Sequence, residues 1–357
     1  MSNSLEPQRR GVLCLLNSLM EDSTEIVYVG LLVAALSAPL APTFMKPLAW
    51  HGKTRSFHQP QQQQQPQSNK KTLWLNFDIH RWVVPKRFFA HFYILGFVSM
   101  ALKVACEVYC NGGPQGQQQQ QSPVAVSPVS LVLRFVMILH IARRYWECIA
   151  VHVWNSHSQM HVAGYVVGLL HYLCLPWALF PHRKDTTIDG VDYFRVILAG
   201  CVAIWAQYQQ HRHHVLLANL RRPNTNRATT TTTAAFSEDK ESGRTTSSVP
   251  PAPHQRLYQF PRGGWFQWLS CPHYFAELLL YTSLYAMAAG GSPHGSALTT
   301  RRVGLLWLWV ATNLMIMARE SHVWYQQQSN KHGNSNDRDK DNKNPPVPKW
   351  AMIPFLF

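Results

Sequence analysis

Charge is scarce in this sequence, and most of it has one sign. Only 14% of the 357 residues are charged, whereas charged residues make up about a quarter of an average soluble domain. The 33 Lys and Arg residues outnumber the 18 Asp and Glu residues. Mean hydropathy is only −0.16, because polar Gln, Thr, Ser and Asn tracts offset long apolar runs. This combination favours a membrane protein over a soluble one.

Several sequence motifs are also missing. No Cys-x-x-Cys pair and no His interleaved with Cys is found, so the seven cysteines predict neither a disulfide framework nor a metal site. Cys106 and Cys110, one helical turn apart, are interpreted as small buried hydrophobic residues. No Gly-x-Gly-x-x-Gly follows a strand pattern, which excludes a Rossmann dinucleotide site.

What the sequence does contain is seven apolar segments of membrane-spanning length, which is about 20 residues of helix. A backbone in lipid must satisfy its own hydrogen bonds, so each segment is expected to be helical. We therefore predict an all-α polytopic membrane protein of about seven transmembrane helices, with a cofactor and lipid cavity between them. The expected spans are 26–45, 88–109, 129–146, 162–180, 193–209, 274–290 and 303–318.

The regions outside the spans are of two kinds. Residues 1–25 are expected to be an N-terminal segment, retained because no small-residue cleavage site follows its apolar stretch. The membrane domain then covers residues 26–357, with disordered insertions of Gln-rich, Thr/Ser-rich or Asn-rich composition. These insertions are expected near 59–71, 111–123, 223–255 and 326–348.

Lys and Arg are distributed unevenly between the two sets of loops. The loops predicted on the side of the C-terminus hold 24 of them, and the N-terminus with the other loops holds 7. The positive-inside rule then predicts a cytosolic C-terminus and an N-terminus on the opposite side. The excess of basic residues is therefore explained by membrane orientation, and no nucleic-acid partner is expected.

The most specific stretch runs from Pro261 to Glu277 and reads Pro-Arg-Gly-Gly-Trp-Phe-Gln-Trp-Leu-Ser-Cys-Pro-His-Tyr-Phe-Ala-Glu. It resembles the signature of the steroid 5α-reductase family, with His273 at a position that is usually Asn. The closing Ile-Pro-Phe-Leu-Phe of residues 353–357 is similar to the family's terminal motif. Residues 84–93 and the Arg143-Arg144-x-x-Glu147 pattern resemble the polyprenal (polyprenol) reductase branch in particular.

The resemblance implies NADPH as cofactor, bound between helices and cytosolic loops. Pyrophosphate and a 2′-phosphate need cations and hydrogen-bond donors. Matching the family motifs residue by residue predicts cofactor-binding positions at Arg144, Gln210, His214, Arg221, His273, Ser321, His322 and Tyr325. Without the resemblance, Arg143 and Arg144 would be interpreted as anchors of a span, and His213 and His214 as an interfacial basic cluster.

The implied reaction adds hydride to the β-carbon of an α,β-unsaturated carbonyl. Such an addition builds negative charge, which an enolate holds and an isolated alkene does not, so the expected substrate is the aldehyde polyprenal. The product is dolichal, for dolichol synthesis and protein N-glycosylation in the endoplasmic reticulum membrane. Glu277 is the first catalytic candidate, because a carboxylate inside an apolar helix needs a partner or a function. The family's carbonyl-polarising Tyr corresponds here to Ile141, so His91, Tyr93 and Tyr145 are the substitutes.

Two other functions stay open at this stage. The same fold reduces a 3-oxo-Δ4 steroid or a trans-2-enoyl-CoA if the substrate differs. A non-catalytic lipid-binding membrane protein is the second alternative, suggested by the changes at Ile141, His273 and Met317. Lys103 and Glu107, four residues apart in one expected span, are interpreted as a structural pair.

Overall fold

The computed structural model describes eight stretches of the chain, which are mostly helical. These are residues 5–37, 82–111, 128–154, 158–180, 192–222, 260–289, 297–333 and 347–354. The α-helices are α1 (Leu5–Ser37), α4 (Phe89–Asn111), α5 (Pro128–Trp146), α6 (Val162–Leu179), α7 (Tyr193–Asn219), α9 (Pro272–Ala289) and α10 (Ala297–Gly333). Each predicted span overlaps one of them, so the predominantly helical fold is confirmed.

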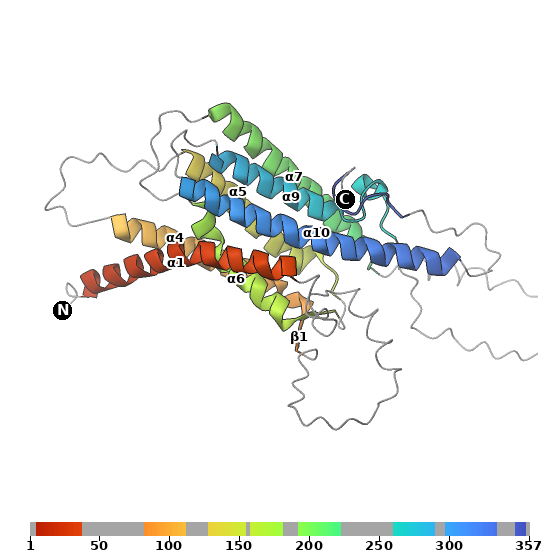
Figure 1. Cartoon of the computed structure of the whole chain (residues 1–357), viewed down its shortest axis with the longest axis horizontal. Coiled ribbons are helices and arrows are strands. Elements are labelled where there is room, and N and C mark those ends of the chain that lie inside the picture. The colour runs from red at the N-terminus through yellow and green to blue at the C-terminus, as the bar shows by residue number, and fades with distance from the viewer. Residues whose placement is uncertain are drawn as a thin grey trace, which may run out of the picture.

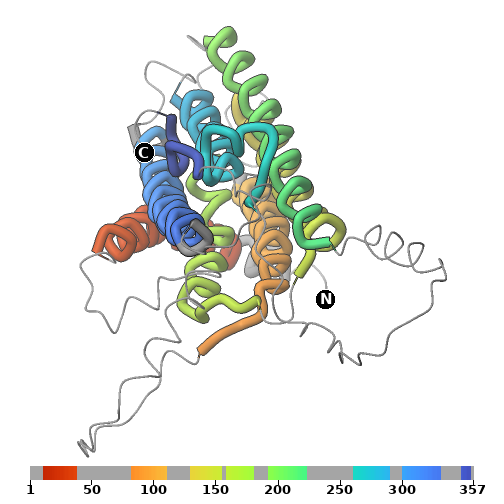
Figure 2. Tube along the Cα trace, turned by 90° about the vertical axis from the view of Figure 1, so that its right-hand side faces the viewer, coloured from red at the N-terminus to blue at the C-terminus, as the bar shows by residue number. Residues whose placement is uncertain are grey.

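The long helices lie side by side in one elongated bundle (Figure 1). Packing is most extensive between α7 and α9 and between α4 and α6, and α10 bridges α9 and α1. Helices α1 and α7 lie on opposite sides of the bundle (Figure 2). The interior is apolar, with fully buried side chains such as Leu133, Met137, Leu175, Leu280 and Leu284.

Two short strands fix one end of this bundle. Strand β1 (Val83–Pro85) pairs antiparallel with β2 (Gln159–His161), and Val84 lies opposite Met160. A 3₁₀ turn, Lys86–Phe88, links β1 to α4, while β2 leads directly into α6. The first residues of α4 and α6 are therefore tied together. This pairing was not predicted from the sequence.

The family signature and the end of the chain meet at the same place. A 3₁₀ turn, Gly264–Gln267, precedes α9, and Gly263 and Gly264 both have positive φ, which favours glycine. The backbone N–H of Ser270 donates to the Trp350 carbonyl over 3.0 Å, and that of Cys271 donates to the Ala351 carbonyl over 2.9 Å. The C-terminal residues therefore pack on the signature.

Two of the described helical stretches have the length and composition of membrane spans. Lys86–Cys110 and Val162–Leu179 are long and apolar enough to cross a membrane. Crossing by all seven helices stays a prediction. Helix α1 begins at Leu5, well before residue 26, and α10 runs through Gly333, into the insertion expected at 326–348. Most residues of the four expected insertions lie outside the described ranges.

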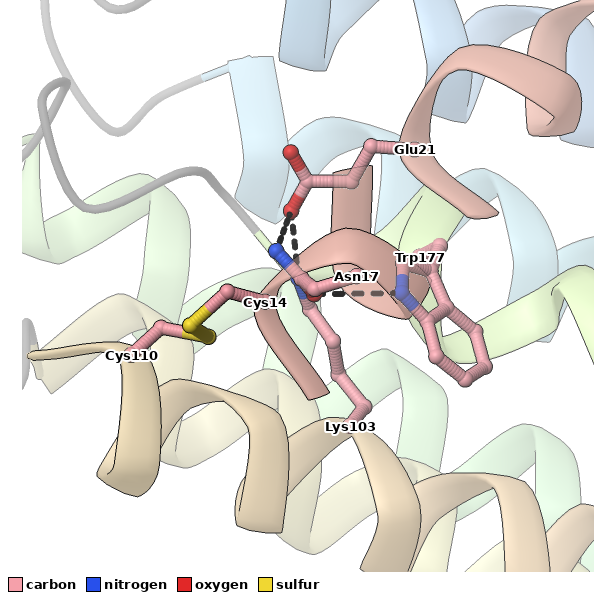
Figure 3. Close-up of a disulfide and its surroundings, with 6 residues drawn as sticks. All are labelled: Cys14, Asn17, Glu21, Lys103, Cys110 and Trp177. Atoms are coloured by element: carbon pink, nitrogen blue, oxygen red, sulfur yellow. Dashed lines mark hydrogen bonds and ion pairs between the residues drawn. A yellow bond between two sulfur atoms is a disulfide. The ribbon is translucent and has the colours of Figure 1, made fainter. Parts of the chain in front are cut away.

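A disulfide between Cys14 and Cys110 corrects the prediction for Cys110, whereas Cys106 is a free buried thiol as predicted. The disulfide joins the first half of α1 to the last turn of α4, across 96 residues of sequence (Figure 3). No spacing rule predicts such a bond, because the two helices are brought together only by the fold.

Lys103 forms the predicted pair with Glu107, at 3.8 Å, and a closer pair that was not predicted. Its ammonium group is almost completely buried and lies 2.6 Å from the Glu21 carboxylate and 3.0 Å from the Asn17 side-chain oxygen (Figure 3). Glu107 also binds Arg134. The role is structural, as predicted, but it holds α1 against α4 rather than stabilising α4 alone.

Candidate active site

A polar cluster forms where the last turns of α5 and α7 meet the first turns of α9. Helix α5 ends in a π-helical turn, Glu147–Val151, and π turns are frequent at functional sites. Side chains from these elements bind one another across the bundle. We define the polar cluster as Arg143, Arg144, Glu147, Gln210, His214 and Glu277.

Glu147 lies at the centre of the polar cluster. Its fully buried carboxylate binds the guanidinium groups of Arg143 and Arg144. The Nδ1 atoms of His214 and His211 lie 2.7 and 2.9 Å from its two oxygens. Burial alone would raise the pKa of Glu147, but the hydrogen bond from His214 and the charges of both arginines hold that pKa far below its ordinary value. Glu147 is therefore ionised at neutral pH and fixes both arginines.

Gln210 links the two carboxylates of the cluster. Its side-chain oxygen accepts a hydrogen bond from Arg143, and its side-chain nitrogen donates to Glu277. The second Glu277 oxygen lies 3.3 Å from Nε2 of His140, which is completely buried on α5. The prediction that Glu277 needs a partner is confirmed, since this carboxylate binds groups from two other helices.

Several nitrogen atoms in or beside the cluster are buried and make no hydrogen bond within the described residues. They include Nδ1 of His213, Nδ1 of His273 and Nε of Arg143. Burial lowers the pKa of His213 to about 4 and that of His273 well below its ordinary value. Both imidazoles are therefore neutral, with one nitrogen able to donate and the other to accept. Buried polar atoms are almost always paired in folded proteins, so a ligand is a natural partner for these.

A cleft of about 330 Å³ opens beside these histidines. Phe266 lies between the cleft and these histidines. It lines the cleft, and its ring centroid lies 5.5 Å from that of His213 and 6.5 Å from that of His273. The lining residues come from the signature, from α10 and from the chain end. They are Phe260, Pro261, Arg262, Gly263, Phe266, Gln267, Ser270, Tyr325 and Pro348.

The cleft and the polar cluster together suit a ligand that carries both aromatic rings and phosphates. Phe260, Phe266 and Tyr325 offer ring faces, and the exposed Arg262 offers a guanidinium group. Arg221, at the end of α7, lies within electrostatic range of Tyr325. A dinucleotide needs this combination of apolar walls and cationic donors.

The structure brings most of the predicted cofactor positions into this region. Arg144, Gln210 and His214 are in the polar cluster, and the His273 and His214 rings lie 5.6 Å apart. Nδ1 of His322 lies 2.7 Å from the Ser270 hydroxyl at the cleft wall. The Ser321 hydroxyl instead donates to the Met317 carbonyl of its own helix, over 2.9 Å.

The three substitutes for the family's tyrosine occupy different places. Tyr93 is buried, and its ring lies 5.5 Å from the Arg144 guanidinium group, at the polar cluster. His91 is exposed, and its Nδ1 lies 2.8 Å from the Tyr165 hydroxyl. Tyr145 is partly buried against the apolar core.

Ile141 itself is completely buried and cannot bind a carbonyl. It packs with Tyr172 against Gly96, where an added Cβ would lie 3.0 Å from the Tyr172 ring and 3.3 Å from the Ile141 side chain. His140, His211 and Glu147 are site residues that the sequence did not predict. The Arg-Arg-x-x-Glu spacing was the available signal for Glu147, because residues three and four apart share a helix face.

Comparison with known proteins bears directly on this region. Residues 251–357 match the 3-oxo-5-alpha-steroid 4-dehydrogenase family. The chain carries a domain of the steroid 5α-reductase family. This domain contains the signature, all the residues that line the cleft, Glu277 and the closing residues, so the resemblance noted from the sequence is confirmed.

Relatives extend the similarity beyond the steroid 5α-reductase domain. Polyprenal reductase 1 of Arabidopsis thaliana is 25% identical over 315 residues, covering 78% of this chain and 82% of its own. The polyprenal reductase of Homo sapiens is 26% identical over 300 residues, covering 77% of this chain and 78% of its own. That of Saccharomyces cerevisiae is 24% identical over 331 residues, covering 92% of each chain.

Proposed function

We propose that this protein is an NADPH-dependent reductase that saturates the α-isoprene double bond of polyprenal and so forms dolichal. The observation that carries the proposal is the similarity to polyprenal reductases of plants, animals and yeast over most of both chains. The reaction class, oxidation and reduction of a CH–CH group, also fits the steroid 5α-reductase domain.

The polar cluster and the cleft support a dinucleotide site. Arg262 and Arg221 would hold phosphates, and the unpaired nitrogens of His213 and His273 would meet the polar edge of a ring. When bound, NADPH supplies the hydride that adds to the β-carbon of the enal. Gln210 accepts from Arg143 and donates to Glu277, so its amide is fixed in one orientation beside this site.

The protein's contribution is to orient the reactants and exclude water. Glu147 holds Arg143 and Arg144 in place, so positive charge is already positioned before any substrate enters. Preorganised charge of this kind stabilises an anionic transition state without further rearrangement. The apolar bundle beneath the cluster keeps water from the reacting carbons while the polyisoprenoid tail stays in lipid.

The proposed setting is the endoplasmic reticulum membrane, crossed by all seven helices. The ends of α5 and α7, which carry the polar cluster, would then face the cytosol together with the C-terminus. This orientation follows the 24-to-7 distribution of Lys and Arg. A cytosolic cleft has direct access to soluble NADPH.

A substrate comparison in microsomes tests the proposal. Membranes carrying the protein are supplied with NADPH and with polyprenal, a 3-oxo-Δ4 steroid or a trans-2-enoyl thioester. We expect dolichal from polyprenal and little turnover of the other two. Reduction of the steroid or the thioester without dolichal would overturn the substrate, and no turnover of any of the three would overturn the enzyme function.

A further inference from the structure

A second group of buried polar side chains lies deeper in the bundle than the polar cluster. Tyr281 is one helical turn beyond Glu277 on α9 and is 2% exposed. Its hydroxyl oxygen lies 3.2 Å from Nε2 of His171, which is on α6 and is 9% exposed. The hydroxyl of Tyr28, on α1, donates to the His171 carbonyl over 3.3 Å. Ionisable and polar groups at this depth are costly and usually functional.

His171 is incompletely satisfied. Its Nδ1 is buried and makes no hydrogen bond within the described residues. A neutral imidazole has one donor and one acceptor nitrogen. If Nε2 carries the proton, it donates to the Tyr281 oxygen, and the Tyr281 O–H is then free to donate elsewhere. A free buried donor costs about 1–3 kcal/mol, which a bound acceptor would offset.

Tyr281 is also connected to the polar cluster. His140 lies between them, with Nε2 3.3 Å from Glu277 and its ring edge-on to Tyr281 at 6.4 Å. Around these groups the interior is apolar, including Leu280, Leu284 and Met287. A carbonyl that reached Glu277 from the lipid side would therefore meet the Tyr281 hydroxyl among apolar side chains.

We propose that Tyr281, held in place by His171, donates the hydrogen bond that polarises the aldehyde oxygen of the substrate. This rests on the proposed function, and it assigns the carbonyl donor that the isoleucine at position 141 does not provide. Tyr281 would be a catalytic residue and His171 a positioning residue.

The reaction balances without a proton from Tyr281. Hydride forms a C–H bond at the β-carbon, the α,β double bond shifts to join the α- and carbonyl carbons, and the oxygen becomes an enolate that accepts the Tyr281 hydrogen bond. The enolate then takes one proton at the α-carbon from a water molecule that enters through the cleft after hydride transfer. NADPH is oxidised to NADP⁺, and the enal is reduced to the saturated aldehyde.

Turnover by single-hydroxyl variants tests the role of Tyr281. We expect Tyr281→Phe to lower kcat for polyprenal by about 100-fold, the cost of removing one such donor, with the Kd for NADPH unchanged. Tyr285→Phe is the matched control, because Tyr285 is half-buried on the same helix, and it should leave kcat unchanged. His171→Gln, which keeps a donor, should retain more activity than His171→Leu.

The carbonyl stretch of a bound enal tests the hydrogen bond without turnover. A short ¹³C-labelled enal bound with NADP⁺ should show a lowered carbonyl frequency in the unmodified protein and a restored one in Tyr281→Phe. The proposal is overturned if the unmodified protein causes no lowering, or if Tyr93→Phe rather than Tyr281→Phe removes it. A failure of the proposed function would instead appear as absent dolichal, so the two failures are distinguishable.

Discussion

At the residue scale, a single carboxylate organises the candidate site. Glu147 is fully buried and balances two guanidinium groups and two histidines. Removing one partner of a buried ionic group leaves the remaining charges without compensation. The integrity of the cofactor site should therefore depend on Glu147 more than on any residue that would touch the cofactor.

Replacing Glu147 by Gln tests this dependence. We expect Glu147→Gln to destabilise the protein by about 3–5 kcal/mol and to weaken NADPH binding, because Arg143 and Arg144 lose their anchor. Glu107→Gln is the control. Glu107 also binds an arginine, but it lies near the C-terminal end of α4, whereas Tyr93 at the polar cluster lies near the N-terminal end. That variant should lower the melting temperature without changing the Kd for NADPH. An unchanged NADPH affinity in Glu147→Gln would contradict the prediction.

Glu320 is expected to make the folded protein less stable as the pH rises. Burial raises its pKa to about 7, against a smaller lowering by Arg319, and one of its oxygens is buried without a hydrogen bond in the described residues. Because the folded pKa lies above the ordinary value of 4.5, the protonated form favours folding. That contribution is fully present below about pH 4.5 and is lost as the pH rises through about 7.

We therefore expect Glu320→Gln to raise the melting temperature by a few degrees at pH 8 and to have little effect at pH 5. Thermal unfolding of both proteins in the same detergent, across this range, measures the difference. Equal melting temperatures at pH 8 would show that Glu320 is ionised without cost in the folded protein.

At the element scale, the apolar runs predicted every described α-helix but not the full length of α1, α7 and α10. Helix α1 extends toward the N-terminus to Leu5 because Glu21, whose charge marked the end of the apolar run, is paired with Lys103 in the fold. A local pattern cannot show such a partner. The β1–β2 pair and the Cys14–Cys110 disulfide were missed for the same reason, since each joins segments that are distant in sequence.

The disulfide should stabilise the contact between α1 and α4. Cys110→Ser is expected to cost about 2–4 kcal/mol, chiefly because the unfolded chain regains freedom. Cys201→Ser is a suitable control, because Cys201 is a free and exposed thiol. Thermal unfolding with and without reductant measures the effect, and the reductant should change the unmodified protein but not Cys110→Ser. Equal stability of both variants would argue against a disulfide in the folded protein.

At the scale of the whole molecule, the polar cluster and the disulfide lie toward opposite ends of the bundle. The polar cluster and the cleft lie where α5 and α7 end, and the disulfide lies at the opposite end of α4 from Tyr93. Disulfides persist in oxidising compartments such as the lumen of the endoplasmic reticulum. Both the disulfide and the distribution of Lys and Arg are consistent with the proposed orientation, in which the cleft faces the cytosol.

Terminal epitope tags test this orientation. In cells whose plasma membrane alone is permeabilised, we expect a C-terminal tag to bind antibody and an N-terminal tag to remain hidden. Dissolving the internal membranes should expose the N-terminal tag as well. Antibody binding to the N-terminal tag before that step would reverse the proposed topology.

Only some of the site residues could be predicted from the sequence, because the others depend on how the helices pack. The family signature located Glu277 and His273 on one helix, and the match to α7 located Gln210 and His214. The partners that bind them across the bundle, above all Glu147 and His140, depend on helix packing that no linear motif records.

The most direct measurement follows the transferred hydride. Purified protein is given polyprenal and NADPH that carries deuterium at the transferred position, and the product is analysed by mass spectrometry and NMR. The proposed chemistry predicts dolichal with one deuterium at the β-carbon. Deuterium at the carbonyl carbon, giving polyprenol with its double bond intact, would contradict it.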